Sequence, residues 1–244
     1  MASEFAPCTE TQKQEVLERL AVIRQKIAEA CRDAGRPESD VTLMAVTKTV
    51  SPELINIAVD AGVHTLGENR VQEFLSKRDA YRPDAEVHFI GHLQTNKVRQ
   101  IIDKVMLIHS VDSLHLAEEI DKAAARQGIV MPVLVEVNIG GEASKSGVSP
   151  AELPQLLSQL QTLSNIRTDG LMTIPPPMTD ETEQNRVFAQ MRQLYDSLRQ
   201  TVPMHVLSMG MSGDYAAAVR NGSTLVRIGS ALFGARYYPP KPEG

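Results

Sequence analysis

The sequence predicts an α/β fold in which eight parallel strands, each followed by a helix, close into a (β/α)8 barrel. Three observations support this prediction. Short apolar runs alternate with longer amphipathic runs along most of the 244 residues. The first short run is apolar at almost every position, as expected of a parallel strand that is buried on both faces. Unusual polar residues follow directly after the apolar runs, and a barrel of this type carries its chemistry at those strand ends.

An extra helix is predicted before the barrel, over residues 11–35. Its apolar residues, among them Val16, Leu20 and Ile23, recur at helical spacing with polar residues between them. The segment that begins at Gly35 contains glycine and proline and ends the helix. This helix could cover the barrel or pair with a second copy of itself.

The barrel is predicted over residues 41–236, and no linker or change of composition divides the chain, so we expect one domain over residues 1–244. Each predicted strand is a short apolar run, and the strands are 41–47, 64–67, 87–91, 105–111, 133–139, 168–174, 205–209 and 225–228. The predicted helices have longer amphipathic runs, and they are 52–61, 70–80, 95–104, 113–127, 150–163, 181–200, 215–221 and a last short one that begins near Ser230. A doubly wound open sheet is the alternative, because periodicity does not distinguish it from a barrel.

Composition and charge argue against several classes of protein. A net charge of −5 and an isoelectric point near 5.7 do not suit a nucleic-acid partner, which needs a clustered positive face. No apolar stretch is long enough to span a bilayer, and residues 1–12 lack the pattern of a secretory signal. Cys8 and Cys31 have no spacing that suggests a metal site or a disulfide framework. We therefore expect a cytoplasmic protein with no bound metal and no membrane partner.

Lys48 closes the first apolar strand and is the most informative residue of the chain. Apolar surroundings disfavour the charged form of a lysine and lower its pKa. A partly neutral amine is what a Schiff base with an aldehyde or ketone requires. The alternative is a strand-end lysine that extends its charged group to solvent.

The segments after the last two predicted strands have the composition of a phosphate site. In many barrels these two loops bind phosphate, with the help of the N-terminus of a short helix. Ser212 can offer a hydroxyl and cap the helix over 215–221, and Gly229 lets the backbone approach a ligand closely. Ser230 opens the final helix, whose free N–H groups favour an anion. The alternative is that these residues supply only turn and cap chemistry.

Arg227 lies in an otherwise apolar strand, so its guanidinium group must find a partner. One interpretation is a buried salt bridge to Asp214 or Glu136. The other is a hydrogen bond to a ligand. An arginine keeps its proton, so it can donate to a ring nitrogen without protonating that nitrogen.

Other polar residues have weaker signals. Asn69 could cap the helix that follows it or face a ligand at the barrel mouth. His92, His109 and His115 have no mutual spacing that suggests a metal site, and we interpret them as structural or peripheral. Lys145 is expected to be solvated, unless its polar loop folds over the mouth and brings a second amine near the ligand.

These features together resemble the alanine-racemase-like barrels that bind pyridoxal 5′-phosphate, the type III fold of enzymes with this cofactor. The resemblance is closer to the single-domain pyridoxal phosphate homeostasis proteins, known as the YggS or PROSC family. It extends in family order from residue 41 to about residue 236. Its motifs are Ala45-Val46-Thr47-Lys48, Gly67-Glu68-Asn69-Arg70-Val71-Gln72-Glu73, His88-Phe89-Ile90-Gly91-His92-Leu93-Gln94-Thr95-Asn96-Lys97, Ser144-Lys145-Ser146-Gly147, Gly170-Leu171-Met172, Ser208-Met209-Gly210-Met211-Ser212-Gly213-Asp214 and Val226-Arg227-Ile228-Gly229-Ser230.

The resemblance implies a role for each residue of the cofactor site. Lys48 would form a covalent aldimine with the cofactor, Arg227 would face its pyridine nitrogen, and Asn69 would lie against the ring or its hydroxyl group. The remaining implied residues hold the phosphate, namely Ser212, Gly229 and Ser230, or line the same pocket, namely Met209 and Gly210. The family often has threonine at the place of Ser230, which retains the hydroxyl group.

The resemblance also raises the question of enzyme or carrier. Racemisation needs an acid/base group on each face of the substrate carbon, and in the two-domain racemases a tyrosine of a second domain supplies one of them. No second base is evident here, because the late tyrosines Tyr237 and Tyr238 lie in a proline-rich tail. We therefore assign no catalytic residue and expect a protein that buffers, stores or delivers pyridoxal phosphate, with recipient enzymes as transient partners, as a monomer or weak homodimer.

Two alternatives stay open from the sequence. One is a weak amino-acid racemase that depends on pyridoxal phosphate. The other is a Schiff-base aldolase that acts on a phosphorylated sugar, although no acid/base pair stands beside Lys48 in the sequence.

Overall fold

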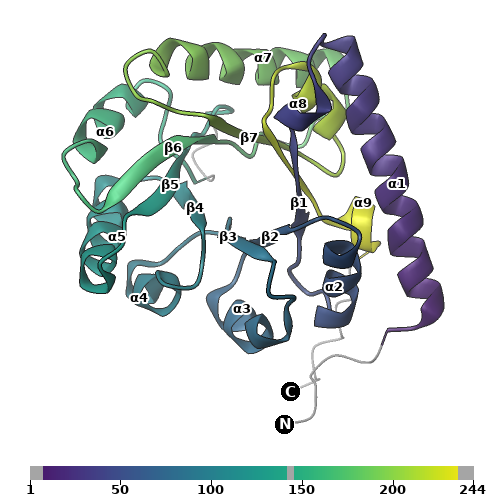
Figure 1. Cartoon of the computed structure of the whole chain (residues 1–244). Coiled ribbons are helices and arrows are strands. Elements are labelled where there is room, and N and C mark those ends of the chain that lie inside the picture. The colour runs from purple at the N-terminus through teal and green to yellow at the C-terminus, as the bar shows by residue number, and fades with distance from the viewer. Residues whose placement is uncertain (1–7, 142–145, 236–244) are drawn as a thin grey trace, which may run out of the picture.

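Eight parallel strands form a closed barrel in the computed structural model, which describes residues 8–141 and 146–235 (Figure 1). Each strand pairs with its neighbours in chain order, and β8 pairs with β1 to close the barrel. The strands are β1 (Thr42–Val46), β2 (Thr65–Glu68), β3 (Glu86–Phe89), β4 (Leu107–Val111), β5 (Met131–Glu136), β6 (Ile166–Met172), β7 (Val206–Met211) and β8 (Leu225–Ile228). The predicted barrel is confirmed, and the open sheet is excluded.

Helices lie outside the barrel and connect successive strands (Figure 1). The α-helices are α1 (Glu10–Asp33), α2 (Pro52–Asp60), α3 (Val71–Lys77), α4 (Val98–Ile101), α5 (Leu114–Gln127), α6 (Leu153–Leu160), α7 (Glu181–Leu198), α8 (Tyr215–Arg220) and α9 (Ser230–Phe233). The described residues also form three short 3₁₀ helices, η1 (Glu38–Asp40), η2 (Arg78–Ala80) and η3 (Thr95–Lys97).

The predicted helix over 95–104 is the largest difference from the sequence prediction. The segment forms η3 followed by the single turn α4, and no side chain caps either element. The predicted helix over 150–163 is also shorter, because it begins at Leu153 with Pro154 in its first turn. A proline is tolerated there because its missing N–H would have no partner inside the helix.

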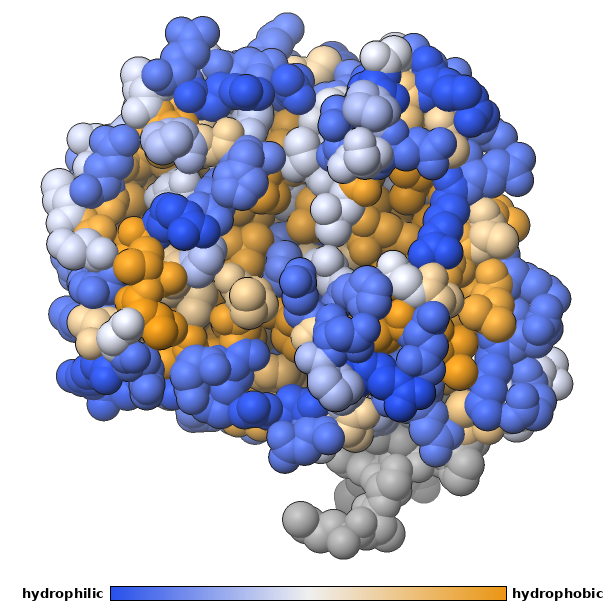
Figure 2. Space-filling view, viewed as in Figure 1, coloured by the Kyte–Doolittle hydropathy of each residue, from blue (hydrophilic) through white to orange (hydrophobic). Residues whose placement is uncertain are grey.

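The extra helix α1 is confirmed and packs against the outside of the barrel. Thr9 and Gln12 form a capping box at its N-terminus, which satisfies free backbone N–H groups. Its buried apolar face belongs to the same core cluster as α2, α8 and α9, and it lies beside these helices (Figure 1). Figure 2 shows hydrophobic residues gathered inside a hydrophilic rim of helices, as the amphipathic pattern of the helices requires.

The interior of the barrel is a packed core. Met44, Val46, Ile90 and Leu225 form one inner cluster, and Leu107, Leu134 and Met172 form another. Glycine at position 67 makes room for the first cluster, since a Cβ atom there would lie 2.6 Å from Met44 Sδ. Buried polar side chains lie nearer the C-terminal strand ends, among them His109, Ser208 and Arg227, and they belong to the site described next.

Candidate functional site

The residues that the sequence singles out come together at one end of the barrel. Parallel strands of a closed barrel all end on the same side, and we call this end the mouth. All eight predicted cofactor-binding residues lie within a strand near its C-terminal end or in the segment directly after it: Lys48, Asn69, Met209, Gly210, Ser212, Arg227, Gly229 and Ser230.

Lys48 is partly buried and lies in a tight turn directly after β1. Val50 N–H donates to the carbonyl oxygen of Thr47 over 3.1 Å and closes the turn. Thr49, the third residue of the turn, has a φ of +62°, which a β-branched residue rarely adopts. Such a conformation costs about 1–3 kcal/mol, so the surrounding structure must hold the turn that presents Lys48.

Arg227 is buried inside the barrel and donates to two neutral acceptors. Its Nη1 atom lies 2.6 Å from Ser208 Oγ, and its Nη2 atom lies 2.8 Å from the carbonyl oxygen of Thr173. No carboxylate of the described residues forms an ion pair with it, so the salt bridge to Asp214 or Glu136 is not formed. Burial lowers the pKa of Arg227 to about 10, and the two carboxylates oppose this shift, so the guanidinium group stays charged at neutral pH.

Two histidines extend the hydrogen bonds of Arg227 across the barrel. His109 Nδ1 lies 3.2 Å from Ser208 Oγ, and His109 Nε2 lies 3.0 Å from His88 Nδ1. Burial lowers the pKa of both rings, that of His88 to about 4, so both are neutral at pH 7. The sequence prediction treated His109 as structural or peripheral, and the structure makes it structural: the ring is buried in the barrel interior beside a partner of Arg227.

Glu136 is a further titratable group at the mouth that the sequence did not assign to the site. It ends β5 on the inward side, because Leu134 two residues earlier belongs to an inner cluster. Burial and the charge of Asp112 raise the pKa of Glu136 to about 7, and Arg227 opposes this shift. Its carboxyl group is therefore partly protonated at neutral pH.

The raised pKa of Glu136 predicts a pH-dependent stability difference between the wild type and Glu136→Gln. The folded state binds a proton that the unfolded state releases, so this group lowers the free energy of unfolding as pH rises from about 4.5 to about 7. Above pH 7 we expect the glutamine variant to be more stable by about 3 kcal/mol, since each pKa unit corresponds to about 1.4 kcal/mol. At pH 4.5 the two proteins should have equal stability. Urea unfolding at both values tests this, and a difference that does not change with pH would contradict it.

Ser212 joins the loops after β7 and β8. Its Oγ atom accepts from the N–H groups of Gly229 and Ala231, both over 3.2 Å. The expectation that Ser212 caps the following helix α8 is wrong, because Asp214 is the N-terminal boundary residue there. The expectation that Ser230 opens the final helix is confirmed, and its side chain is exposed.

Gly210 occupies a position that only glycine fits. Its φ is +94°, and a Cβ atom would lie 2.5 Å from Ala218 Cβ. We expect Gly210→Ala to lower the free energy of unfolding by about 1–3 kcal/mol, because both the backbone and the packing against α8 become strained. Gly213→Ala, in the loop directly after β7, is the matched control, since no atom lies within 4 Å of its added Cβ atom. Thermal melting of both variants checks this, and equal losses would contradict it.

Asn69 does not cap the following helix. A helix cap was the alternative to ligand binding in the sequence analysis. Arg70 is the boundary residue of α3, and no side chain caps this helix. The Oδ1 atom of Asn69 is buried and has no hydrogen-bond partner among the described residues. Buried polar atoms are nearly always paired, so this acceptor is available to a ligand.

The sequence also named His92, His115 and Lys145. His92 and His115 are exposed, and Lys145 lies outside the described residues. Within the described part of the chain, no three metal-binding side chains cluster and no helix is long and apolar enough to cross a membrane. A hollow of about 830 Å³ opens near the first residues of β1, β7 and β8, away from the mouth, and none of the eight predicted residues lines it.

Comparison with known proteins places this geometry in a family context. The family described as alanine racemase, N-terminal domain, matches residues 19–237. A pyridoxal phosphate homeostasis protein of Aquifex aeolicus is 46% identical over 224 residues, which cover 91% of this chain and 98% of that protein. An unknown protein from Bifidobacterium adolescentis has a solved structure with a TM-score of 0.89 and 36% identity, covering 95% of this chain and 100% of that one.

Two further solved structures bear on the cofactor and on the racemases. PipY of Synechococcus elongatus, with PLP bound, has a TM-score of 0.78 and 37% identity over 90% of this chain and 100% of that chain. An alanine racemase of Clostridium difficile has a TM-score of 0.72 but only 18% identity, and the match covers 94% of this chain and 58% of the racemase. This second likeness concerns the fold alone, so the racemases are distant relatives.

Proposed function

Because the chain belongs to the family that carries the alanine racemase N-terminal domain and includes the pyridoxal phosphate homeostasis proteins, we propose that its barrel mouth binds pyridoxal phosphate. In this proposal the protein stores, buffers or delivers the cofactor without robust catalysis of its own. When bound, pyridoxal phosphate supplies an aldehyde that condenses with a primary amine and releases water.

The polar groups at the mouth fit each end of this cofactor. The unpaired Oδ1 atom of Asn69 is a buried acceptor that suits the ring hydroxyl group. Arg227 is buried, positively charged and held by Ser208, so it can donate to the pyridine nitrogen without protonating it. This convergence of a buried arginine and an unpaired amide oxygen on the end of the barrel that carries Lys48 is the observation that supports the proposal.

The phosphate is assigned to the loops after β7 and β8. Ser212 links these loops, and Ser230 adds an exposed hydroxyl group at the start of α9. Met209 and Gly210 would line the same pocket, where the absence of a side chain at Gly210 permits close packing. Lys48 would hold the cofactor covalently through a Schiff base.

A carrier is favoured over a racemase by the groups that surround the mouth. A buried arginine beside the ring nitrogen does not keep that nitrogen protonated and so weakens the cofactor as an electron sink, although racemases of this fold tolerate such an arginine. We therefore infer a cytoplasmic protein that passes the cofactor to other enzymes, with the barrel and α1 acting as one domain.

Transfer of the cofactor tests this function directly. The loaded protein is mixed with an aminotransferase from which pyridoxal phosphate has been removed, and the activity of the aminotransferase is followed. We expect that activity to return, and no formation of D-alanine from L-alanine by the protein alone. A racemase turnover in the ordinary range of enzymes, roughly 1–10³ s⁻¹, would overturn the carrier assignment in favour of the racemase alternative.

A further inference from the structure

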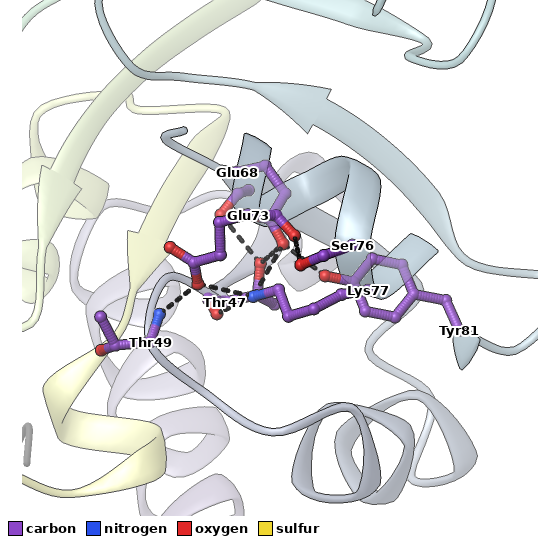
Figure 3. A network of polar contacts seen from close by, with 8 residues as sticks. Thr47, Thr49, Glu68, Glu73, Ser76, Lys77 and Tyr81 are labelled. Atoms are coloured by element: carbon purple, nitrogen blue, oxygen red, sulfur yellow. Dashed lines mark hydrogen bonds and ion pairs between the residues drawn. The ribbon is translucent and has the colours of Figure 1, made fainter. Parts of the chain in front are cut away.

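A buried network of charged side chains lies behind the Lys48 turn, on the outer side of the barrel (Figure 3). Lys77, Glu68 and Glu73 form it, together with Tyr81, and we call it the Lys77 network. Glu68 faces outward in β2, since its neighbour Gly67 faces the inner cluster of Met44. The network therefore fills the space between the barrel wall and α3, and its side chains do not line the mouth.

The ammonium group of Lys77 is the centre of the network. Its side chain is fully buried, and its Nζ atom lies 2.8 Å from Glu73 Oε1 and 3.3 Å from Glu68 Oε1. The same atom donates to the carbonyl oxygen of Thr47 over 2.9 Å. Glu68 in turn accepts from Tyr81 Oη and, over 2.7 Å, from Thr47 Oγ1. A buried charge needs such partners, because removal from water is costly.

Two contacts of the network fall on the backbone groups that flank Lys48. Lys77 binds the carbonyl oxygen of Thr47 on one side. Glu73 Oε1 accepts from the N–H group of Thr49 over 2.5 Å on the other side. Thr49 is the residue with the left-handed backbone, so the network holds the turn at its strained position.

We propose that Glu73 and Lys77 are positioning residues that fix the turn from which Lys48 extends. This inference rests on the proposed function, since it concerns the placement of the amine that would hold the cofactor. An ion-pair network of this kind is a poor device for stability alone, because apolar side chains of similar volume are often as good. Its hydrogen bonds instead fall on the two residues beside Lys48, and a reaction with an aldehyde depends strongly on the placement of the amine.

Glu73 offers the sharpest test, because its side chain is 16% exposed and its loss leaves Lys77 paired with Glu68. Glu73→Leu removes the acceptor of the Thr49 N–H group, and Glu73→Gln keeps an oxygen there. Asp121→Leu is the matched control, since Asp121 is also a helix carboxylate that accepts a loop N–H, that of Asn165, over 2.6 Å. Asp121 lies on α5, and the residue that it binds precedes β6 at the end of the barrel away from the mouth.

Two readouts separate positioning from stability. The first is the rate at which added pyridoxal phosphate forms a borohydride-reducible adduct at Lys48, with the adduct located by peptide mapping. The second is hydrogen exchange of the Thr49 amide in the cofactor-free protein. We expect Glu73→Leu to slow adduct formation at least tenfold and to accelerate Thr49 exchange. Glu73→Gln should keep both the rate of adduct formation and the Thr49 exchange rate close to the wild-type values. Asp121→Leu should change neither rate, although its melting temperature falls.

The outcomes are distinguishable. If Glu73→Leu forms the adduct at the wild-type rate while it melts at a lower temperature, the network is only structural and the positioning role is overturned, but the proposed function stands. If the wild-type protein itself forms no adduct at Lys48, both the proposed function and this inference are overturned.

Discussion

Replacement of Lys48 by alanine is expected to have the largest effect on cofactor binding of any single change. Lys48→Ala removes the amine that would link the cofactor to the turn after β1, and affinity for pyridoxal phosphate should fall at least about tenfold. The fold should be retained, because the side chain is only partly buried and lies at the surface end of the strand. Titration followed by absorbance, together with a thermal melt, checks both statements.

Lys122→Ala is the control for this experiment, because Lys122 is an exposed lysine on α5, paired with Glu119. Lys122 can form a non-specific Schiff base with excess aldehyde, as any surface amine can. A Lys48→Ala protein that binds as tightly and reacts as fast as the wild type would remove Lys48 from its assigned role.

Arg227→Leu is expected to have the second largest effect. The change removes a charged donor from the buried site, and a hydrogen bond to a charged group contributes about 1.5–3 kcal/mol, so affinity should fall roughly 10- to 100-fold. The absorbance maximum of the bound cofactor should also shift, because the partner of its ring nitrogen is lost. Equilibrium titration and the visible spectrum measure the two effects.

Arg192→Leu is a suitable comparison for Arg227→Leu. Arg192 is a half-buried arginine on α7 that pairs with Asp196 and lines the hollow away from the mouth. Its loss should affect stability without changing affinity or spectrum. An Arg227→Leu protein with an unchanged spectrum would place Arg227 outside the cofactor site.

The barrel and the location of the site could be predicted because both depend on local patterns. Apolar runs mark strands, and in a barrel the residues just after them share one end whatever their distance in sequence. Lys48 and Arg227 were therefore recognisable, since a charged residue in or at the end of an apolar strand is unusual. The pairing of β1 with β8, which places Met44 opposite Arg227 and closes the barrel, is not visible in the sequence. It is set by the closure of the barrel.

The corrections within the site concern contacts between distant segments. Ser212 was expected to cap the next helix, whereas its hydroxyl group binds N–H groups 17 and 19 residues later in the chain. His109 forms a hydrogen bond with Ser208, which is 99 residues away in the sequence. No local sequence pattern predicts such a pair. Its inward position, two residues from the end of β4, was the available signal. Lys77 ends α3 like an ordinary surface lysine, and only the packing of that helix against β1 and β2 buries it.

The central claim is that Lys48 holds pyridoxal phosphate at the barrel mouth. The most direct test is the absorbance spectrum of the purified protein before and after addition of pyridoxal phosphate, followed by borohydride reduction and mapping of the modified peptide. The account predicts a visible band that borohydride removes and a label on Lys48. A protein that shows no band with added cofactor, or that carries its label at another lysine, would contradict it.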